Sequence, residues 1–336
     1  MGKAGWTNGS SNFDLDLERA IDMIKRFGAQ RVGVQVPEGL KREAPHIAKE
    51  IERRTKAKVI VSGDPCYGAC DVDLELCREV DLLMHIGHAE MLEGDPELDK
   101  VIYIEARMNV GLKGAVEEAV KHLQSDRVGV ITTVQHVHRL REVIEVLKEH
   151  RIEGIVGIGE SRTRYPGQVL GCNYDVARGL DVGEYLFVGT GQFHPLGVAL
   201  STEKRVIAAD PFTCEVSEVD PVPMIKRRYG AIARALDAER IAVMVSKKPG
   251  QKRWDLAQEM MDLGKGHGKN MVLVYLDRME PDVLINLGVE AAVCTACPRI
   301  ALDDQTKYPV PILTPPEFEV LLGEYEGEEY PLDEIE

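Results

Sequence analysis

Hydrophobic and polar positions along the chain follow a pattern that occurs three times. Each copy begins with a short run rich in Val and Ile, at 31–40, 127–136 and 240–250. Such runs are typical of strands that are buried in a parallel sheet. After a polar loop, apolar residues recur at helical spacing in each copy, which predicts amphipathic helices. These helices are expected at 41–54, 138–150 and 252–264.

The remainder of each copy also matches in kind. A second strand is predicted at 58–63, 155–159 and 271–276. A third strand that runs into a Gly- or Cys-bearing loop is predicted at 81–91, 184–195 and 289–299, and a fourth at 100–106, 204–212 and 308–316. Alternation of strand and helix indicates parallel sheets with right-handed crossovers. We therefore predict an α/β protein of three similar domains, at 12–108, 109–215 and 216–330.

The loops that follow the three first strands are the predicted binding loops. Parallel α/β units bind ligands beyond the carboxyl ends of their strands. This places the loops Gln35–Gly39, Thr132–His136 and Ser246–Gln251 at potential sites. Three domains that face one axis would share a central pocket, and the alternative is three independent domains without one.

Composition and charge restrict the class of protein. Hydrophobic residues make up 44% and charged residues 29% of the chain, as in an ordinary globular protein. The net charge of −15 argues against a nucleic-acid partner. We find neither an apolar run of the ~18–20 residues that a membrane span needs nor a secretory signal. The expectation is a cytoplasmic protein with a loose polar leader and a solvated acidic tail at 323–336.

Five of the seven cysteines lie in three short segments rich in glycine, proline or other small residues. These are Cys66 and Cys70, then Cys172, and finally the C-x-x-C pair Cys294 and Cys297. Without an export signal, thiol ligands or free thiols are favoured over disulfides. Small neighbours allow a metal or a cluster to approach the backbone. The other two, Cys77 in a predicted helix and Cys214, are expected to be structural.

Spacing alone leaves three kinds of chemistry open for these thiols. Thiolates are the usual ligands of iron–sulfur clusters. Four thiolates, Cys70, Cys172, Cys294 and Cys297, would also form a closed zinc site. A lone C-x-x-C is compatible with a redox pair, and scattered thiols without any metal are the remaining alternative.

An ordered set of motifs along the chain resembles one family. The motifs are QVPEGL (35–40), YGACDVD (67–73), TTVQHVHRL (132–140), SRTRYPGQVLGCNY (161–174), FHPLG (193–197), DPF (210–212) and ACPRIALDD (296–304). Together they resemble the archaeal diphthamide synthases, the 2-(3-amino-3-carboxypropyl)histidine synthases that perform the first step of diphthamide formation. The resemblance extends from about residue 15 to 325. It implies three α/β domains in approximate threefold arrangement around a central cluster, usually in a homodimer.

The resemblance also implies a cofactor and a reaction. Each domain would give one cysteine to a [4Fe–4S] cluster: Cys70 of YGAC, Cys172 of LGCNY and Cys297 of ACPR. Cys66 and Cys294 fall outside the family pattern; they are close enough in sequence to be rival ligands, but the resemblance implies that they are spectators. The fourth iron would engage S-adenosylmethionine, and an electron donor would reduce the cluster. A 3-amino-3-carboxypropyl radical would then add to C2 of a histidine on translation elongation factor 2. The chain lacks the C-x-x-x-C-x-x-C motif of ordinary radical enzymes.

Polar residues near the strand ends and motifs are the predicted contacts of the cosubstrate. They are Gln35, Glu38, Tyr67, Gly68, Thr133, Gln135, His136, His194, Ser246, Lys248, Gln251, Arg299, Asp303 and Asp304. Alternatively, Glu38 caps a helix, Asp303 and Asp304 are a cap and a surface charge, and His136 lies at a helix surface. The histidines of HIGHAE, QHVH and FHP are not expected to share one metal site.

Two other functions remain open on the residues alone. A quinolinate-synthase-like iron–sulfur enzyme would also use three similar domains and three cysteines, without S-adenosylmethionine. A non-catalytic binding module stabilised by zinc would use four thiols. The ordered motif set favours diphthamide synthesis over the quinolinate-synthase-like enzyme, and the zinc module predicts a colourless protein that binds zinc rather than iron.

Overall fold

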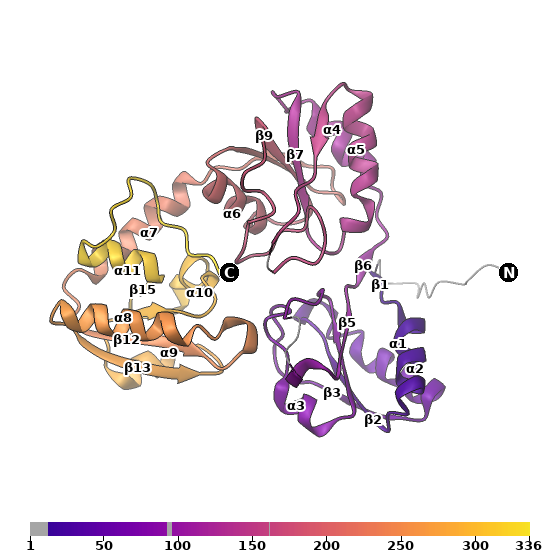
Figure 1. Ribbon diagram of the computed structural model, residues 1–336, viewed down its shortest axis with the longest axis horizontal. Helices are drawn as coiled ribbons and strands as arrows, with labels where there is room; N and C mark the ends of the chain where they lie inside the picture. Colours follow the sequence, from indigo (N-terminus) through magenta and orange to yellow (C-terminus); the bar gives the residue numbers. More distant parts are fainter. Residues whose placement is uncertain (1–12, 93–95, 161) are drawn as a thin grey trace. The chain divides into compact units, whose positions relative to one another are not determined.

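The computed structural model describes residues 13–92, 96–160 and 162–336, and the chain packs as two compact units (Figure 1). The first unit contains Met1–Val169, Asp175–Gly191 and Ile207–Ser217. The second unit contains Leu170–Tyr174, Gln192–Val206 and Glu218–Glu336. The expected polar leader lies mostly outside the described residues, as does Ser161 of the fourth motif.

The first parallel sheet has the strand order β3-β2-β4-β5. Its strands are β2 (Arg31–Gln35), β3 (Lys58–Val61), β4 (Leu82–Ile86) and β5 (Val101–Ile104). Three helices accompany it: α1 (Leu17–Phe27), α2 (Ala44–Thr55) and α3 (Leu74–Glu79). Short 3-10 turns, η1 (Glu38–Leu40) and η2 (Pro96–Leu98), follow β2 and precede β5. The first and last strands of this part of the chain, β1 (Phe13–Asp14) and β6 (Arg107–Met108), form a separate antiparallel pair.

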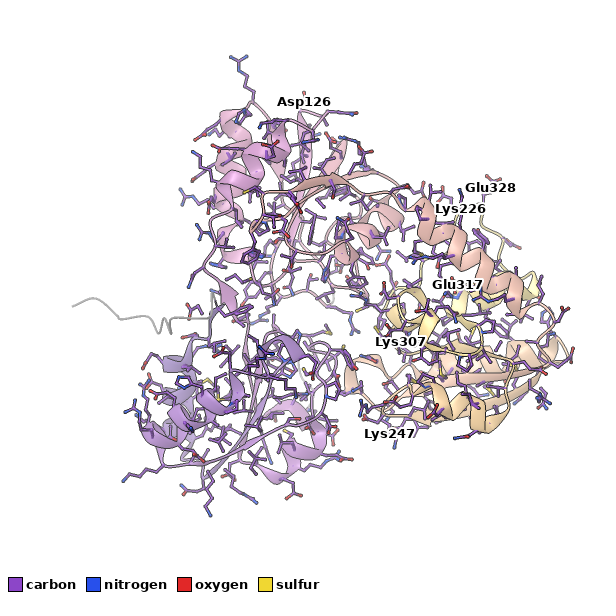
Figure 2. All side chains as sticks on the ribbon, turned by 180° about the vertical axis from the view of Figure 1, so that it is seen from behind. Asp126, Lys226, Lys247, Lys307, Glu317 and Glu328 are labelled. Carbon is purple, nitrogen blue, oxygen red and sulfur yellow. The ribbon has the colours of Figure 1, made fainter. Side chains whose placement is uncertain are left out.

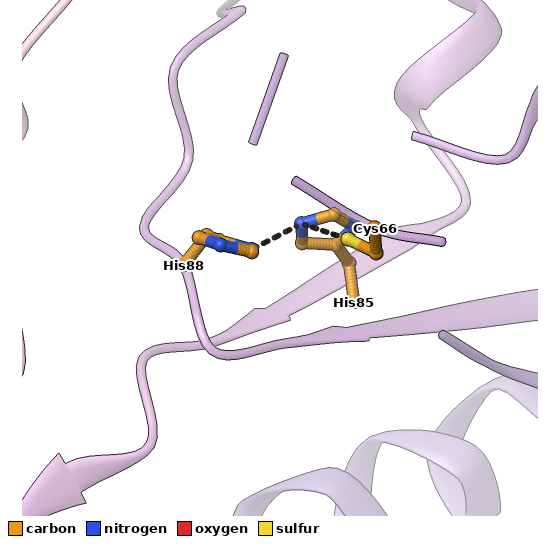
Figure 3. Close-up of side chains that lie close together, drawn as sticks. All are labelled: Cys66, His85 and His88. Carbon is orange, nitrogen blue, oxygen red and sulfur yellow. Dashed lines mark hydrogen bonds between the residues drawn. The ribbon is translucent and has the colours of Figure 1, made fainter. Parts of the chain in front are cut away.

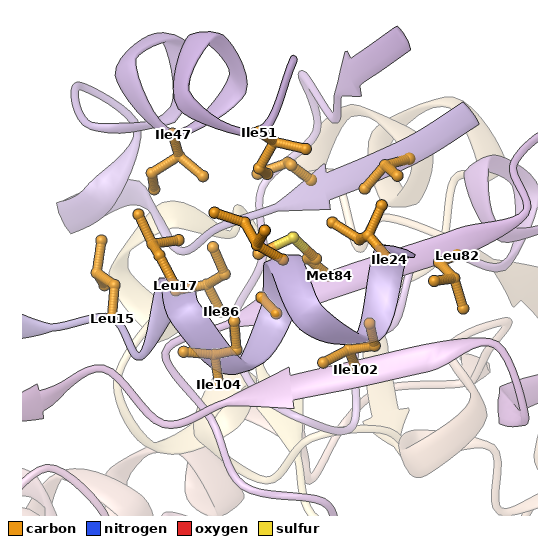
Figure 4. Packing of buried hydrophobic residues seen from close by; sticks show 14 of the residues in the cluster. Leu15, Leu17, Ile24, Ile47, Ile51, Leu82, Met84, Ile86, Ile102 and Ile104 are labelled. Atoms are coloured by element: carbon orange, nitrogen blue, oxygen red, sulfur yellow. The ribbon is translucent and has the colours of Figure 1, made fainter. Parts of the chain in front are cut away.

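The core of the first sheet forms where α1 and α2 cover one face. Ile24 of α1 and Ile47 and Ile51 of α2 pack with Met84 and Ile104 of the strands (Figure 4). All five side chains are buried. Helix α1 was not predicted, although its apolar residues recur at helical spacing. A smaller cluster packs α3 against Leu83 of β4.

The second sheet has the strand order β11-β10-β9-β7-β8, in which β7 pairs in parallel with both β8 and β9. Its strands are β7 (Arg127–Thr132), β8 (Glu153–Ile155), β9 (Glu184–Val188), β10 (Arg205–Ala209) and β11 (Val216–Glu218). The associated elements are α4 (Lys113–Val120), η3 (Val137–Arg139) and α5 (Leu140–Glu149), whereas α6 (Phe193–Thr202), which follows β9 in the chain, belongs to the second unit. The predicted strand at 155–159 begins earlier and ends at Ile155. A Cβ at Gly157 would overlap the carbonyl of Val176, so this segment lies against a loop.

The third parallel sheet, in the second unit, has the strand order β13-β12-β14-β15. Its strands are β12 (Arg240–Ser246), β13 (Asn270–Leu276), β14 (Ala291–Cys294) and β15 (Ile312–Leu313). The helices are α7 (Val222–Ala235), α8 (Trp254–Gly266), α9 (Pro281–Leu287), α10 (Arg299–Leu302) and α11 (Pro315–Leu322). Two 3-10 turns, η4 (Pro249–Gln251) and η5 (Gln305–Lys307), lie in its loops.

A buried ion pair connects the elements around this third sheet. Exposed charges such as Asp126 and Lys226 contrast with Glu317, which is fully buried (Figure 2). Glu317 of α11 binds Arg228 of α7 at 2.6 Å, and Arg228 also donates to the carbonyl of Ile312. Because each buried charge has a partner, the pair connects α7, α11 and β15 without leaving an unpaired charge in the core.

The three sheets confirm the threefold repeat of strands that the sequence predicts. In each, the first strand of the repeat lies between the second and the third, and a 3-10 turn follows its carboxyl end. The boundaries proposed for three domains stay a prediction. Among the described residues, no helix is both long and apolar enough to span a bilayer.

Candidate metal centre

Cys70 lies in a loop that the carboxyl end of β2 holds in place. Gln35, the last residue of β2, is buried, and its Nε2 donates to the carbonyl of Asp71 at 2.7 Å. Its Oε1 accepts from the backbone N–H of Asp73 at 3.1 Å. Asp73 in turn caps α3 by accepting from the N–H of Leu76. The loop is therefore anchored directly after Cys70, at Asp71 and Asp73.

The two thiols of this loop have different surroundings. Cys70 is partly exposed, and a Cβ at Gly68 would lie 3.2 Å from its Sγ. Cys66 is buried, and its Sγ lies 4.0 Å from Nε2 of His85. Tyr67, between them, is 69% exposed. Cys70 is thus the thiol of this loop that is open to an external group, next to a residue without a side chain.

A cavity of about 300 Å³ lies within the first unit at the carboxyl ends of its strands. Two of the predicted loops line it together: Pro37 and Gly39 come from the loop after β2, and Thr133, Gln135 and His136 come from the loop after β7. His88 and Gly87, after β4, also line it. Glu38 instead begins η1 with an exposed side chain, 3.9 Å from the ammonium of Lys41.

His136 presents an unsatisfied polar atom beside this cavity. Its side chain is 2% exposed, and its Nδ1 has no hydrogen-bond partner among the residues that the structure describes. Burial, helped by the positive charges of His138 and Arg139, lowers the pKa of His136 to about 4. A neutral, buried ring nitrogen without a partner is suited to bind a polar ligand. Its neighbour Gln135 donates to the carbonyl of Gly87 at 2.9 Å.

Cys172 and Cys297 both lie near Tyr174 in the second unit. Burial raises the pKa of Tyr174, and the charges of Cys172 and Cys297 add to the effect. Gly171 precedes Cys172, and a Cβ there would overlap the ring of Phe193 and come within 3.4 Å of Cδ of Arg299. The structure therefore brings together the LGCNY and ACPR motifs, which are more than a hundred residues apart in sequence.

The C-terminal residues Asp333–Ile335, with Arg253, form what we call the C-terminal clamp. Arg253 donates to the carbonyls of Thr295 and Ala296 at 2.8 and 3.0 Å, beside Cys297. It also forms an ion pair with Asp333 at 2.6 Å. The N–H of Ile335 donates to the carbonyl of Cys172 at 2.8 Å. The clamp therefore fixes the backbone of both cysteine loops.

The clamp corrects the expectation of a solvated acidic tail. Asp333 is 5% and Ile335 is 4% exposed. The negative charge of the tail suggested solvation, but Asp333 has a cationic partner in the core. Burial lowers the pKa of Arg253, but hydrogen bonding and attraction to Asp333 outweigh burial and leave it above its ordinary value. Charges on Cys172 and Cys294 raise it further, which places this cation close to the thiols.

The remaining cysteines divide into buried and exposed thiols. Cys294 ends β14, is fully buried, and donates to the carbonyl of Cys297 at 3.6 Å. Burial raises its pKa to about 12. Cys77 lies in α3 as expected and contacts the carbonyl of Glu97. Cys214 is exposed, and its expected structural role stays a prediction.

The other predicted residues of the second unit have varied surroundings. Ser246 is buried at the end of β12, and its Oγ accepts from the N–H of Lys248. Gln251 is buried in η4. Burial, with the charge of Arg299, lowers the pKa of His194 to about 4.

Three charged residues of the ACPRIALDD motif form local pairs. Arg299 pairs with Asp303 at 2.7 Å, and Asp304 pairs with Lys307 at 2.8 Å. Both pairs are largely exposed and connect residues three or four positions apart. The cosubstrate contacts of these residues stay predictions.

Sequence reasoning missed the clamp residues Arg253, Asp333 and Ile335. No motif marks them, because their contacts join segments that only the fold brings together. From the sequence, Arg253 at the start of α8 and the acidic tail both resemble charged residues that are exposed to solvent.

The fold and the thiols define an α/β protein that presents cysteine-bearing loops beyond the strands of parallel sheets. The chain belongs to the diphthamide synthesis family: residues 36–331 match the family described as putative diphthamide synthesis protein. It is 41% identical to the 2-(3-amino-3-carboxypropyl)histidine synthase of Pyrococcus horikoshii, covering 96% of this chain and 94% of that protein. Its relatives of that name are enzymes of diphthamide biosynthesis.

More distant relatives and a solved structure agree. The synthase of the same name from Methanocaldococcus jannaschii is 31% identical, with 96% of this chain and 93% of that protein covered. Subunit 1 of the human synthase is 28% identical over 96% of this chain and 75% of that protein. The crystal structure of Dph2 from Pyrococcus horikoshii with a 4Fe-4S cluster has a TM-score of 0.90 at 39% identity, covering 96% and 94% of the two chains.

Proposed function

We propose that this chain transfers the 3-amino-3-carboxypropyl group of S-adenosylmethionine to C2 of a histidine of translation elongation factor 2. This is the first step of diphthamide formation. The observation that carries the proposal is the different placement of the cysteines. Cys70 and Cys297 are partly exposed, and Cys172, although buried, lies in a loop whose backbone accepts a hydrogen bond from Ile335, whereas the rivals Cys66 and Cys294 face the core.

Cys70, Cys172 and Cys297 would hold a [4Fe–4S] cluster in this proposal. Three similar domains in approximate threefold arrangement would each give one thiolate. The donor set fits such a cluster: the ligands are thiols, Gly68 and Gly171 lie next to two of them, and the cation of Arg253 lies near Cys172. A cationic neighbour favours the thiolate form that binds iron. Three protein ligands leave one iron open.

The cluster, once bound and reduced by an electron donor, supplies the electron that breaks the bond between sulfur and the γ-carbon of the cosubstrate. The net reaction joins the γ-carbon to C2 of the histidine and releases 5′-methylthioadenosine. The hydrogen of C2 leaves as a proton, and the electron is returned, so the transfer is redox-neutral overall.

The chain's own residues bind and orient the cosubstrate and exclude water. His136 and Gln135 line the cavity of the first unit, where the unsatisfied Nδ1 of His136 is suited to a polar group. Cations such as Lys248 and Arg299 are candidates for the methionine carboxylate, and carboxylates such as Asp303 for its ammonium group. The protein is proposed to act in the cytoplasm as a homodimer.

The test is a reconstitution without oxygen. The purified protein is analysed for iron and sulfide, then reduced and supplied with S-adenosylmethionine and elongation factor 2. We expect a coloured, iron-loaded protein, release of 5′-methylthioadenosine, and carbon from the cosubstrate on the factor. The triple variant Cys70→Ala, Cys172→Ala, Cys297→Ala should lose both cluster and product, while Cys77→Ala, a control thiol in α3, should retain them.

Three outcomes would contradict the proposal. A colourless protein that holds only zinc would support the binding module instead. A cluster that survives the triple substitution would exclude the assigned ligands. Release of deoxyadenosine would show that a different bond of the cosubstrate is broken.

A further inference from the structure

Cys66, His85 and His88 form a compact cluster of ligand atoms that the proposed reaction does not use. One ligand atom of each residue lies within 4.8 Å of those of the other two. Nε2 of His85 is 3.0 Å from Nδ1 of His88 and 4.0 Å from Sγ of Cys66 (Figure 3). The residues come from the loop after β3, from β4, and from the turn that follows β4.

The hydrogen bonds of Gln35 fix the tautomer of His85. The Nε2 amide of Gln35 donates to the carbonyl of Asp71, so its Oε1 must be the atom that faces Asp73 and His85. Oε1 is 2.8 Å from Nδ1 of His85 and can only accept, so Nδ1 carries the proton. The lone pair of His85 is therefore on Nε2, the atom that faces Cys66 and His88.

This arrangement is the one that metal-binding histidines adopt. A ligating histidine commonly donates its other ring N–H to an oxygen, which orients the ring and makes the free nitrogen more basic. Ligands at 2.0–2.3 Å around a tetrahedral zinc ion lie about 3.3–3.8 Å apart. The observed separations of 3.0 and 4.0 Å straddle that range. The ligand atoms of Cys66 and His88 lie within 4.8 Å of each other, so this third separation would have to close by up to about 1 Å.

We propose that Cys66, His85 and His88 bind one divalent cation of the zinc class, at a site separate from the iron–sulfur ligands. One thiolate and two imidazoles suit zinc better than the oxygen-preferring magnesium or calcium. Three protein ligands leave a fourth position for water. His88 also lines the cavity of the first unit, which gives water and the cation a route to the site.

The cation would join the cysteine loop to the sheet. Cys66 and Cys70 belong to the same loop, whereas His85 belongs to the central part of the first sheet. Binding would fix the end of the loop that Gln35 does not hold and so position Cys70. The site requires no activity of the enzyme, so it is tested independently of the proposed function.

The experiment separates this site from the cluster cysteines by removing them. Full-length protein with Cys70→Ser, Cys172→Ser and Cys297→Ser is freed of metal and titrated with Co²⁺ without oxygen, then with Zn²⁺ in competition. We expect one equivalent of Co²⁺ with the absorption of a tetrahedral, thiolate-bound ion, displaced by Zn²⁺. Adding Cys66→Ser should abolish the thiolate band, and adding His88→Ala should weaken binding at least tenfold. Adding Cys77→Ser, a buried thiol outside the cluster, should change neither.

Cluster-loaded protein with all its cysteines provides a second measurement if the triple variant does not fold. We expect one zinc per chain in addition to iron, lost in Cys66→Ser with the iron content retained. Zinc binding that is insensitive to Cys66 and His88, or the absence of stoichiometric binding in both proteins, would overturn the proposal. Loss of transfer activity with zinc retained would count against the proposed function alone.

Discussion

The loop of Cys70 and the loops of Cys172 and Cys297 are held in different ways. The Cys70 loop depends on Gln35, a neutral side chain at the end of a strand in the same sheet. The loops of Cys172 and Cys297 depend on the C-terminal clamp, in which Asn173 and Ile335 are 162 positions apart and Arg253 pairs with Asp333. One set of ligands is thus positioned by local hydrogen bonds and the other by a distant ion pair.

These two kinds of support should differ in the free energy that is lost when one supporting side chain is removed. A neutral amide that is removed leaves unsatisfied polar groups, which cost about 1–3 kcal/mol. A buried ion pair that loses one partner leaves a charge in the core, which costs about 3–5 kcal/mol. The second unit should therefore be more sensitive to single substitutions in its support than the first.

The largest effect is expected for Asp333→Ala. Arg253 would keep its charge with only carbonyl partners, and the free energy of unfolding should fall by about 3–5 kcal/mol. Urea unfolding measures this loss, and hydrogen exchange should show the loops of Cys172 and Cys297 opening first. Glu145→Ala is the control, since its pair with Arg141 is exposed and should contribute about 0.5 kcal/mol. Equal losses in both variants would contradict the role of the clamp.

The next effect is expected for Gln35→Leu in the first unit. The carbonyl of Asp71, the N–H of Asp73 and Nδ1 of His85 would lose a partner, which should cost about 2–3 kcal/mol. Hydrogen exchange at 64–73 should increase, and the iron content should fall. Gln258→Leu removes only an exposed hydrogen bond to Asp262 and should leave both unchanged. An unchanged loop in Gln35→Leu would show that Cys70 is held by other contacts.

The glycines beside the ligands give a matched pair of smaller effects. Gly171→Ala would drive a methyl group into Phe193 and should cost about 1–3 kcal/mol. Gly68→Ala would meet Sγ of Cys70, the movable end of a side chain, and should cost less than about 1 kcal/mol. Urea unfolding compares the two. The reverse order would show that the Cys70 loop is the more tightly packed one.

The last expected effect, similar in size to those of the glycines, is the pH dependence due to His136. Its pKa of about 4 in the folded protein lies below the ordinary value of 6.5, so the unfolded chain binds the proton first. The stability it contributes is complete above pH 6.5 and is lost as the pH falls toward 4. Between pH 7.5 and 5.5 the loss should be about 1.4 kcal/mol larger in the parent than in His136→Gln. An equal loss of stability in the parent and in His136→Gln would show that the pH dependence comes from another titrating group.

The sequence by itself determined the repeat and its consequences. Val- and Ile-rich runs at 31–35, 127–132 and 240–246 form the strands they predicted, because a continuous apolar run can be buried only between two layers. The strand-end loops followed from parallel topology, and two of them do line one cavity. The ordered motifs indicated the family, which the comparisons confirm.

Only the tertiary structure decided how the cysteine loops are supported and which thiols face inward. Cys66 and Cys70 lie in the same loop and have similar sequence neighbours, so the sequence does not distinguish them. In the structure they differ because His85 lies against Cys66. Asp333 looked like a solvated charge, and its burial depends on Arg253, far away along the chain. Pairings between distant residues leave no periodic pattern in a sequence, because each depends on where the fold places its partner.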